Sequence, residues 1–145
     1  MRLAKTRDVK TPTRANSTDA GIDFFIPNTA QPFTIKPGEA SLIPSGIKVD
    51  VPVNHALVAF NKSGIASKKQ LIVGACVVDC GYQGEIYINM QNIGREEQVL
   101  LPGDKIVQFA LLQLGDPMVT EVKEEELYTD VSDRGEGALG STGTK

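Results

Sequence analysis

Five short segments of the chain combine glycines with charged or polar side chains. They are AGID at 20–23, KSGIA at 62–66, VVDCGYQGE at 77–85, GDKIVQ at 103–108 and the tail RGEGALGSTG at 134–143. In the tail, backbone N–H groups that no side chain obstructs could close over an anionic ligand, with Arg134 as the charged partner. The alternative for the tail is a flexible appendage. Taken singly, AGID, KSGIA and GDKIVQ could equally be a strand-entry turn, a helix cap and a hairpin turn.

Histidine and cysteine chemistry finds little support in the sequence. His55 is the only histidine, so a zinc site, Ser-His-Asp catalysis and Cys-His catalysis would all depend on it. We expect His55 at the edge of a strand instead. On one extended strand, Cys76 and Cys80 would lie about 13 Å apart at ~3.3 Å per residue, too far for a disulfide. We therefore expect two reduced thiols.

Prolines and glycines cut the chain into runs of strand length that are rich in β-branched and aliphatic residues. The clearest runs are 22–26, 47–51, 56–60, 75–78, 85–91 and 105–114. Many short strands with frequent turn signals indicate a sandwich, jelly roll or barrel. We interpret 105–114 as a fully buried strand. The one candidate helix is 63–69, with Ser63 as its N-cap, so the sequence predicts an all-β fold with one short helix.

Length and charge narrow the class of protein. The chain has 145 residues, enough for one domain, and its 41% hydrophobic and 23% charged residues are typical of globular proteins. A net charge of −3 argues against a general nucleic-acid binder. The basic segment 1–14 is expected to be a solvated strand rather than a nucleic-acid arm. No apolar run suggests a membrane span or a signal peptide, so we expect an intracellular, cytoplasmic protein. We expect neither a membrane nor a nucleic acid as a partner.

In their order and spacing, the five segments resemble the five motifs of the homotrimeric dUTP pyrophosphatase (dUTPase) family, from Ala20 to Gly143. The resemblance implies a jelly-roll-like β protein that forms homotrimers with shared active sites. It implies hydrolysis of dUTP to dUMP and pyrophosphate with Mg²⁺ as cofactor, which would remove dUTP from the nucleotide pool and supply dUMP. It also implies a β domain over residues 1–127 and a flexible tail at 128–145 that closes over an active site.

The resemblance assigns roles to individual residues. Asp79 would be the general base for the attacking water, and Asp23 would support the region of the phosphates and the metal-bound water. The phosphate chain and the base would be contacted by Lys62, Ser63, Gly64, Gln108, Arg134, Leu139, Gly140, Ser141 and Thr142. Mg²⁺ would be held by the triphosphate and by water, with no direct protein ligand.

A hairpin at 75–87 would select the base and the sugar. Its main chain would pair with uracil, and cytosine would be rejected because it leaves buried groups unpaired. Tyr82 would lie against the deoxyribose and leave no room for a 2′-hydroxyl; alternatively, it packs in the core or in an interface. Cys76, Val78 and Tyr87 belong to the same hairpin and are expected to contact the substrate.

Three positions depart from the family pattern. Lys62 stands where the second motif usually has arginine, so a bidentate contact becomes a point charge. Gly81 stands where a second aspartate is frequent. Leu139 stands where the tail usually has an aromatic residue, so it could cover uracil by dispersion but without a π-face. We expect the tail to close more weakly than in relatives that carry the aromatic residue.

Two other functions stay open at this point. dCTP deaminase is a related trimeric β enzyme that also binds deoxynucleotide triphosphates, although residues 77–85 resemble the pyrophosphatase hairpin. A nucleotide-gated signalling trimer would bind the nucleotide to act on a protein partner. Asp79, Gln108 and Arg134 favour retained chemistry, and a protein partner in addition is compatible with the sequence.

Overall fold

The computed structural model describes residues 1–115 and 118–137, and its contacts divide the chain into two compact units, Met1–Gly115 and Asp116–Lys145. The first unit contains β1 (Arg2–Lys5), β2 (Ile22–Phe25), β3 (Phe33–Ile35), β4 (Ala40–Pro44), β5 (Ile47–Asp50), β6 (His55–Asn61), α1 (Ser63–Lys69), β7 (Leu71–Val73), β8 (Val77–Val78), β9 (Tyr87–Asn92), β10 (Gln98–Leu100) and β11 (Lys105–Gln113). In the second unit, the described residues include one 3₁₀ turn, η1 (Glu124–Glu126). The predicted boundary at residue 127 stays a prediction.

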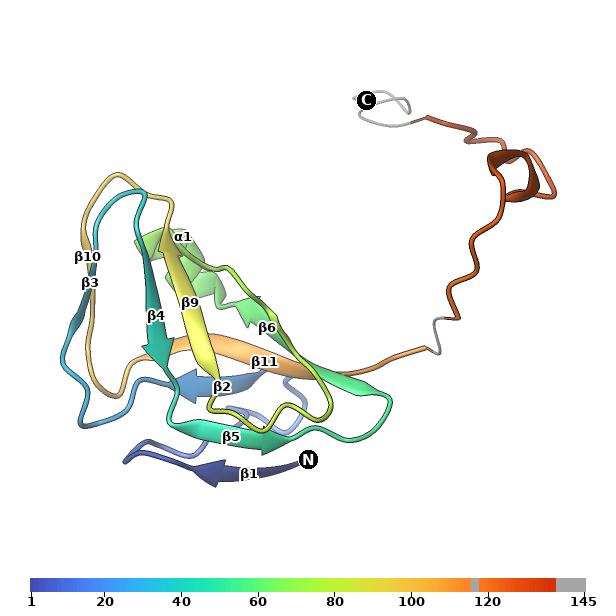
Figure 1. Ribbon diagram of the computed structural model, residues 1–145. Helices are drawn as coiled ribbons and strands as arrows, with labels where there is room; N and C mark the ends of the chain where they lie inside the picture. The colour runs from blue at the N-terminus through green and yellow to red at the C-terminus, as the bar shows by residue number, and fades with distance from the viewer. Residues whose placement is uncertain (116–117, 138–145) are drawn as a thin grey trace. The chain divides into compact units, whose positions relative to one another are not determined.

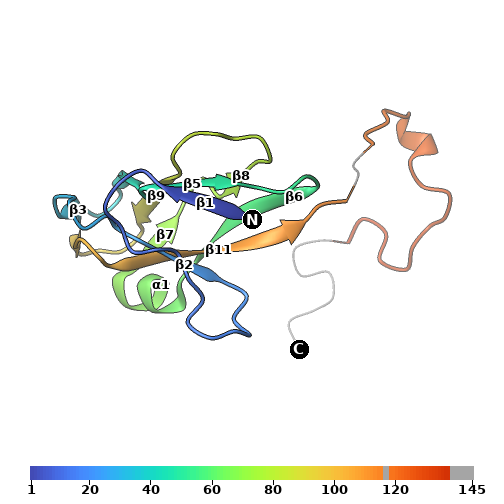
Figure 2. The same ribbon diagram turned by 90° about the horizontal axis from the view of Figure 1, so that it is seen from below.

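Within residues 1–115, the strands form four small antiparallel sheets. Their strand orders are β2-β11-β6-β8, β4-β9-β7, β1-β5 and β10-β3 (Figures 1 and 2, in which β7 and β8 are labelled only in Figure 2). Figures 1 and 2 show α1 on one side of this unit and the β1–β5 pair on the other. The all-β prediction with one short α-helix at 63–69 is therefore confirmed. Among the described residues, no helix has the length and apolarity that crossing a membrane requires.

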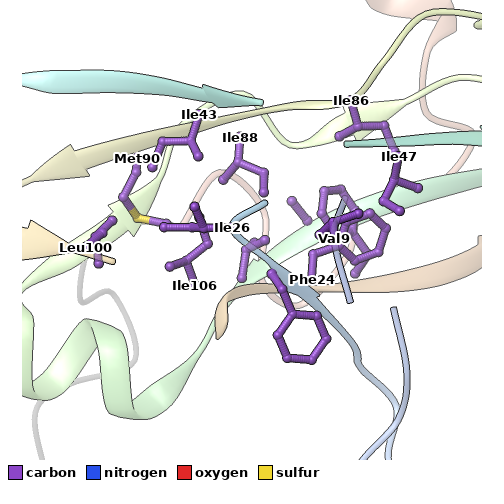
Figure 3. Packing of buried hydrophobic residues seen from close by; sticks show 14 of the residues in the cluster. Val9, Phe24, Ile26, Ile43, Ile47, Ile86, Ile88, Met90, Leu100 and Ile106 are labelled. Carbon is purple, nitrogen blue, oxygen red and sulfur yellow. The ribbon is translucent and has the colours of Figure 1, made fainter. Parts of the chain in front are cut away.

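The core of the first unit lies between the strands and is built from alternating side chains. Ile86, Ile88 and Met90 are buried, whereas Tyr87 between them is exposed, as the period-two pattern predicts. Figure 3 shows Ile88 and Met90 packing toward Ile26 in the interior. Fully burying one such side chain contributes roughly 1.5–3 kcal/mol. This core holds the strands that carry the candidate site residues.

The predicted full burial of residues 105–114 is wrong for the second half of the strand. Ile106, Val107 and Phe109 are buried, but Leu111 and Leu112 are exposed. A continuous apolar run can reflect either core on both faces or an apolar face at the surface. Here the run continues beyond the part of β11 that other elements of this unit cover.

The predicted N-cap of α1 is also wrong by one residue. Lys62 occupies the N-cap position with extended backbone angles and makes no side-chain cap hydrogen bond, and Ser63 is the first helical residue. The first intrahelical bond runs from Ala66 N to Lys62 O, at 2.8 Å. Two smaller predictions are confirmed, since His55 begins β6 and both cysteines are free thiols.

Candidate active site

The connection between β8 and β9 surrounds a pocket of about 210 Å³, which we call the loop pocket. It is lined by Ala59, Val73, Ala75, Cys76, Val77, Val78, Asp79, Tyr82, Ile86, Tyr87, Ile88 and Phe109. Sites for drug-sized ligands hold roughly 300–1,000 Å³, so this pocket suits a single planar ring with part of its substituent. All five residues predicted from segment 75–87 line it: Cys76, Val78, Asp79, Tyr82 and Tyr87.

Residues 75–87 do not form the predicted two-stranded hairpin. β8 pairs with β6, whereas β9 pairs with β4 and β7, so residues 79–86 connect two sheets. We call this connection the 79–86 loop. β8 is the edge strand of its sheet, so among the described strands one side of its main chain has no partner. Main-chain donors and acceptors on such an edge can pair with an extended or planar polar ligand.

Asp79 follows β8 directly and lies at the rim of the loop pocket. Its side chain is exposed, and its carbonyl accepts a hydrogen bond from Tyr82 N at 3.2 Å, which closes a turn. Gly81 in this turn has a φ of +90°, a conformation that side-chain-bearing residues rarely adopt. Glycine at residue 81 adopts this conformation without strain. The turn leaves the Asp79 carboxylate accessible to water.

Tyr82 closes one side of the loop pocket. Its hydroxyl donates to Glu85 O at 2.9 Å, so the ring folds back over the loop. A Cβ atom on Gly84 would lie 2.3 Å from the Tyr82 hydroxyl oxygen, so this ring position requires glycine at residue 84. The glycine and the tyrosine of the GYQGE segment therefore depend on each other.

A second group of predicted residues gathers around Asp23, and we call it the Asp23 cluster: Asp23, Lys62, Lys105 and Gln108. Asp23 is 5% exposed and lies opposite Gln108 in the pairing of β2 with β11. Lys62 Nζ donates to Asp23 Oδ1, and Lys105 Nζ lies 3.2 Å from Oδ2. Burial raises the pKa of Asp23, but hydrogen bonds from Lys62 and Lys105 outweigh it, and the net pKa is lowered. Asp23 thus stays ionised and orients two ammonium groups.

Gln108 is held in place by its neighbours in the sheets. Its Nε2 donates to Asn61 O at 2.9 Å. A Cβ atom on Gly21 would lie 2.2 Å from Gln108 Oε1, so the glycine of the AGID segment makes room for this amide. Ser63 and Gly64 follow Lys62 and are exposed, and no atom lies within 4 Å of where a Gly64 Cβ would stand. A ligand could therefore approach the first turn of α1 closely.

The loop pocket and the Asp23 cluster lie on opposite faces of one sheet. Phe109 and its partner Ala59 line the loop pocket. Gln108 and its partner Phe60 are the next residues along the same two strands. Because successive side chains of a strand point to opposite faces, Gln108 points away from the pocket that Phe109 lines. The predicted site residues of this unit are thus divided between two separate surfaces.

The second unit carries the remaining predicted residues. Arg134 is exposed, and its Nε donates to Gly137 O at 3.1 Å. Leu139, Gly140, Ser141 and Thr142 lie outside the described residues. Sequence reasoning missed Lys105, which completes the Asp23 cluster. Its position next to Asp104 in the GDKIVQ segment was the available signal.

The described residues contain no group of three or more His, Cys, Asp or Glu side chains that could enclose a metal ion. Both Asp23 oxygens are occupied by lysines, so direct coordination by Asp23 would break these ion pairs. Mg²⁺ keeps several waters and is commonly bound through substrate phosphates with few carboxylates. These side chains therefore fit an ion that arrives with a phosphate ligand better than one held in a protein cage.

Comparisons with known proteins agree with these features. The dUTPase family model matches residues 7–143. A deoxyuridine 5'-triphosphate nucleotidohydrolase of Corynebacterium jeikeium is 40% identical over 141 residues, covering 94% of this chain and 88% of the relative. The enzyme of the same name from Chlamydia muridarum is 34% identical over 134 residues, covering 91% of this chain and 90% of the relative.

Solved structures show the same fold. The dUTPase of Staphylococcus bacteriophage 80alpha, solved with dUPNHPP, superposes with a TM-score of 0.85 at 24% identity, covering 98% of this chain and 97% of that chain. A mutant dUTPase of phage phi11 of S. aureus, described with a structural Mg(II) ion, has a TM-score of 0.77 at 22% identity, covering 86% of this chain and 97% of that chain. With the family model covering nearly its whole length, the chain belongs to the dUTPase family.

Proposed function

We propose that this protein hydrolyses dUTP to dUMP and pyrophosphate, at active sites shared between the subunits of a homotrimer. The observation that carries the proposal is the loop pocket, where a cavity of base size lies beside an unpaired strand edge and the exposed carboxylate of Asp79. The similarity to deoxyuridine 5'-triphosphate nucleotidohydrolases supports the choice of substrate. The pool on which the enzyme acts would be intracellular.

In this proposal the loop pocket binds the nucleoside. The main chain of residues 76–78 pairs with the polar edge of uracil, and the apolar walls contributed by Ile86, Ile88 and Phe109 cover its ring. Tyr82 packs against the deoxyribose, because its ring closes the pocket beside the turn. The 2′-hydroxyl of UTP would be in steric conflict with Tyr82, which disfavours UTP. The exocyclic amino group of dCTP would be left unpaired against the main chain, which disfavours dCTP.

The Asp23 cluster binds the phosphate chain in this proposal. The ammonium groups of Lys62 and Lys105 attract the anion, and the Gln108 amide and the Ser63 hydroxyl donate hydrogen bonds to it. By their place in the fifth motif of the family, Arg134, Gly140, Ser141 and Thr142 would contact the phosphates of the bound nucleotide, and Leu139 would contact its base. Mg²⁺, when bound with the triphosphate, neutralises charge on its oxygens.

Asp79 performs the proton transfer. A water molecule at the rim of the loop pocket donates its proton to the Asp79 carboxylate while its oxygen attacks a phosphorus atom of the triphosphate. When the α-phosphorus is attacked, its bond to the oxygen that bridges to the β-phosphorus breaks. The bridging oxygen leaves with pyrophosphate, and the oxygen of the water becomes part of the phosphate of dUMP. Positioning the water and the phosphorus in line supplies the rest of the rate enhancement.

The trimer is supported by the division of the site between two faces of a sheet. The loop pocket alone is too small for a nucleoside triphosphate, and the Asp23 cluster lies on the other face. A second copy of the chain could place its Asp23 cluster beside the loop pocket of the first. Phe60 and Leu112 are exposed on the face that carries Gln108, and such apolar residues suit an interface between subunits.

The proposal is tested by incubating the protein with dUTP, UTP, dCTP and dTTP in the presence of Mg²⁺ and measuring pyrophosphate. We expect release from dUTP alone, with loss of turnover after chelation and recovery when Mg²⁺ is added back. Ammonia is measured in the dCTP reaction, because its release would indicate a deaminase instead. Equal cleavage of all four nucleotides would contradict the assignment of the loop pocket to uracil and deoxyribose.

A further inference from the structure

The 79–86 loop is joined to the N-terminal segment by a bidentate ion pair. Arg7 Nε lies 2.8 Å from Glu85 Oε1, and Arg7 Nη2 lies 3.1 Å from Glu85 Oε2. Glu85 Oε1 also accepts a hydrogen bond from Gly46 N at 2.8 Å. The side chains of Arg7 and Glu85 are 42% and 13% exposed, respectively. Paired guanidinium and carboxylate groups in this geometry fix orientation as well as distance.

The end of the loop that carries Glu85 is fixed to β5 and the turn before it. Ile86 N donates to Ile47 O at 2.9 Å, and Ser45 N donates to Ile86 O at 3.0 Å. Thr6 N donates to Gly46 O at 2.8 Å, which ties the segment before Arg7 to the same turn. Residues 45–47 and the N-terminal segment thus hold Glu85 from two directions.

Glu85 in turn holds Tyr82. The Tyr82 hydroxyl donates to the carbonyl of Glu85, the residue whose carboxylate Arg7 binds. Asp79 is fixed differently, because it directly follows β8, where Val78 pairs with Leu57 of β6. A shift of Glu85 would therefore move the Tyr82 ring more than the Asp79 carboxylate.

The tip of the loop has little other support on its far side. A second pocket of about 470 Å³ lies between residues 81–83 and the strands β1 and β5. Tyr82 lines both this pocket and the loop pocket. The tip therefore has open space into which it could move if its hydrogen bond to Glu85 were displaced.

We propose that Arg7 and Glu85 form a positioning pair that keeps Tyr82 against the sugar of the bound nucleotide. The inference rests on the proposed function, and it assigns to Arg7 a role in nucleotide selection that the motif residues alone do not indicate. Arg7 and Glu85 are positioning residues, because they act on the substrate through Tyr82. Breaking the pair weakens binding of dUTP and weakens the exclusion of a 2′-hydroxyl, while the proton transfer to Asp79 continues.

The test compares Arg7→Gln with the wild-type enzyme in steady-state assays on dUTP and UTP. We expect the KM for dUTP to rise about tenfold with kcat nearly unchanged, and the preference for dUTP over UTP in kcat/KM to fall about tenfold. Arg7→Lys keeps the positive charge but loses the planar, bidentate guanidinium. Its KM for dUTP and its preference for dUTP should therefore lie between those of the wild-type enzyme and Arg7→Gln. A loss of folded protein alone would lower kcat for both nucleotides and leave KM and the preference unchanged.

Arg2→Gln is the matched control. Arg2 Nε and Nη2 bind Asp50 Oδ2 at 3.0 and 2.5 Å on the neighbouring strands, but these side chains are 89% and 60% exposed and do not bond the loop. We expect wild-type KM and wild-type preference in this variant. Glu85→Gln is the second variant, because it removes the charge of the pair and retains an oxygen that can accept from Gly46 N.

The outcomes separate the two proposals. Absence of dUTP hydrolysis by the wild-type protein overturns the proposed function. If the wild-type protein hydrolyses dUTP, but folded Arg7→Gln and Glu85→Gln both keep the wild-type KM and the wild-type preference for dUTP, only the positioning role is overturned. An equal change in Arg2→Gln also overturns it, because the effect would then come from charge near the N-terminus.

Discussion

Gln108 and Phe109 are consecutive residues of β11 whose side chains lie on opposite faces of the same sheet. Phe109 lines the loop pocket and packs against Phe24, with ring centroids 4.4 Å apart. Gln108 lies opposite Asp23 and belongs to the Asp23 cluster. β11 thus contributes one residue to the loop pocket and the next residue to the Asp23 cluster, although these two surfaces lie on opposite faces of the sheet. Under the proposed function, a complete site requires loop and cluster from different chains.

Asp79→Asn should remove catalysis and retain nucleotide binding. The amide has the shape of the carboxylate but cannot take a proton from water, so we expect kcat to fall about 10²–10⁴-fold. Because Asp79 is exposed, the fold should be unaffected. Steady-state kinetics measures the loss, and calorimetric titration with dUMP measures binding. Turnover close to wild type would remove Asp79 from the mechanism.

Gly21→Ala should impair the enzyme through Gln108. The new methyl group would lie 2.2 Å from Gln108 Oε1, so the amide must leave its position beside Asn61. We expect kcat/KM to fall about tenfold, and the double variant Gly21→Ala with Gln108→Ala to be no worse than Gln108→Ala. Additive losses would show that Gly21 acts independently of Gln108. Gly115→Ala is the control, because no atom lies within 4 Å of its Cβ position.

Acid should destabilise the fold through Glu85 and Asp23. Hydrogen bonds from Arg7 chiefly lower the pKa of Glu85 from its ordinary value of 4.5, against an opposing effect of burial. A carboxyl group with a lowered folded-state pKa stabilises the fold above its unfolded pKa and loses this contribution as the pH falls through the folded value. The free energy of unfolding should therefore fall below about pH 4.5.

Glu85→Gln tests this pH dependence. Chemical denaturation between pH 7 and pH 3 should show a shallower decline for Glu85→Gln than for the wild-type protein, because the variant has one fewer titrating group. Protonation of Asp23 should also lower the free energy of unfolding, since the pKa of Asp23 is lowered from its ordinary value of 3.8. Because its ordinary pKa is the lower of the two, the contribution of Asp23 should begin to fall at a lower pH than that of Glu85. Parallel curves for wild type and Glu85→Gln would contradict the assignment.

Phe60→Lys should weaken the assembly of subunits. Phe60 is exposed, lies opposite Gln108 and belongs to the sheet face that we assign to a subunit interface. A charge buried between subunits without a partner is costly, so the variant should dissociate at concentrations where the wild-type protein is trimeric. Sedimentation velocity measures the change, and circular dichroism confirms the fold. A wild-type sedimentation profile would place the interface elsewhere.

Much of the strand pattern could be predicted from the sequence, because an apolar run between turn residues coincides with each of the strands β2, β5, β6, β9 and β11. The short strands β3, β7 and β10 have three residues each and too little periodicity to be recognised alone. They are defined by partners distant in the chain, as in the pairing of β10 with β3. The exposed end of β11 was missed because hydrophobicity does not say which faces other elements cover.

The part of the candidate site that is formed by residues close together in the sequence could be predicted. The VVDCGYQGE segment correctly gathers Asp79 and Tyr82 at one pocket. The ion pair between Arg7 and Glu85 joins residues 78 positions apart, which no local pattern indicates. The separation of Gln108 from the loop pocket depends on the register of β11 against β6, which only the structure supplies.

The most direct test of the shared site is complementation between two inactive chains. One chain carries Asp79→Asn in its loop, and the other carries Ser63→Ala with Gln108→Met at the phosphate-binding surface. Each assembles alone into a poorly active enzyme. Refolded together in equal amounts, they should recover about a quarter of the wild-type kcat, because one in four random pairings joins an intact loop to an intact cluster. Mixed trimers no more active than the separate variants would contradict a site built from two chains.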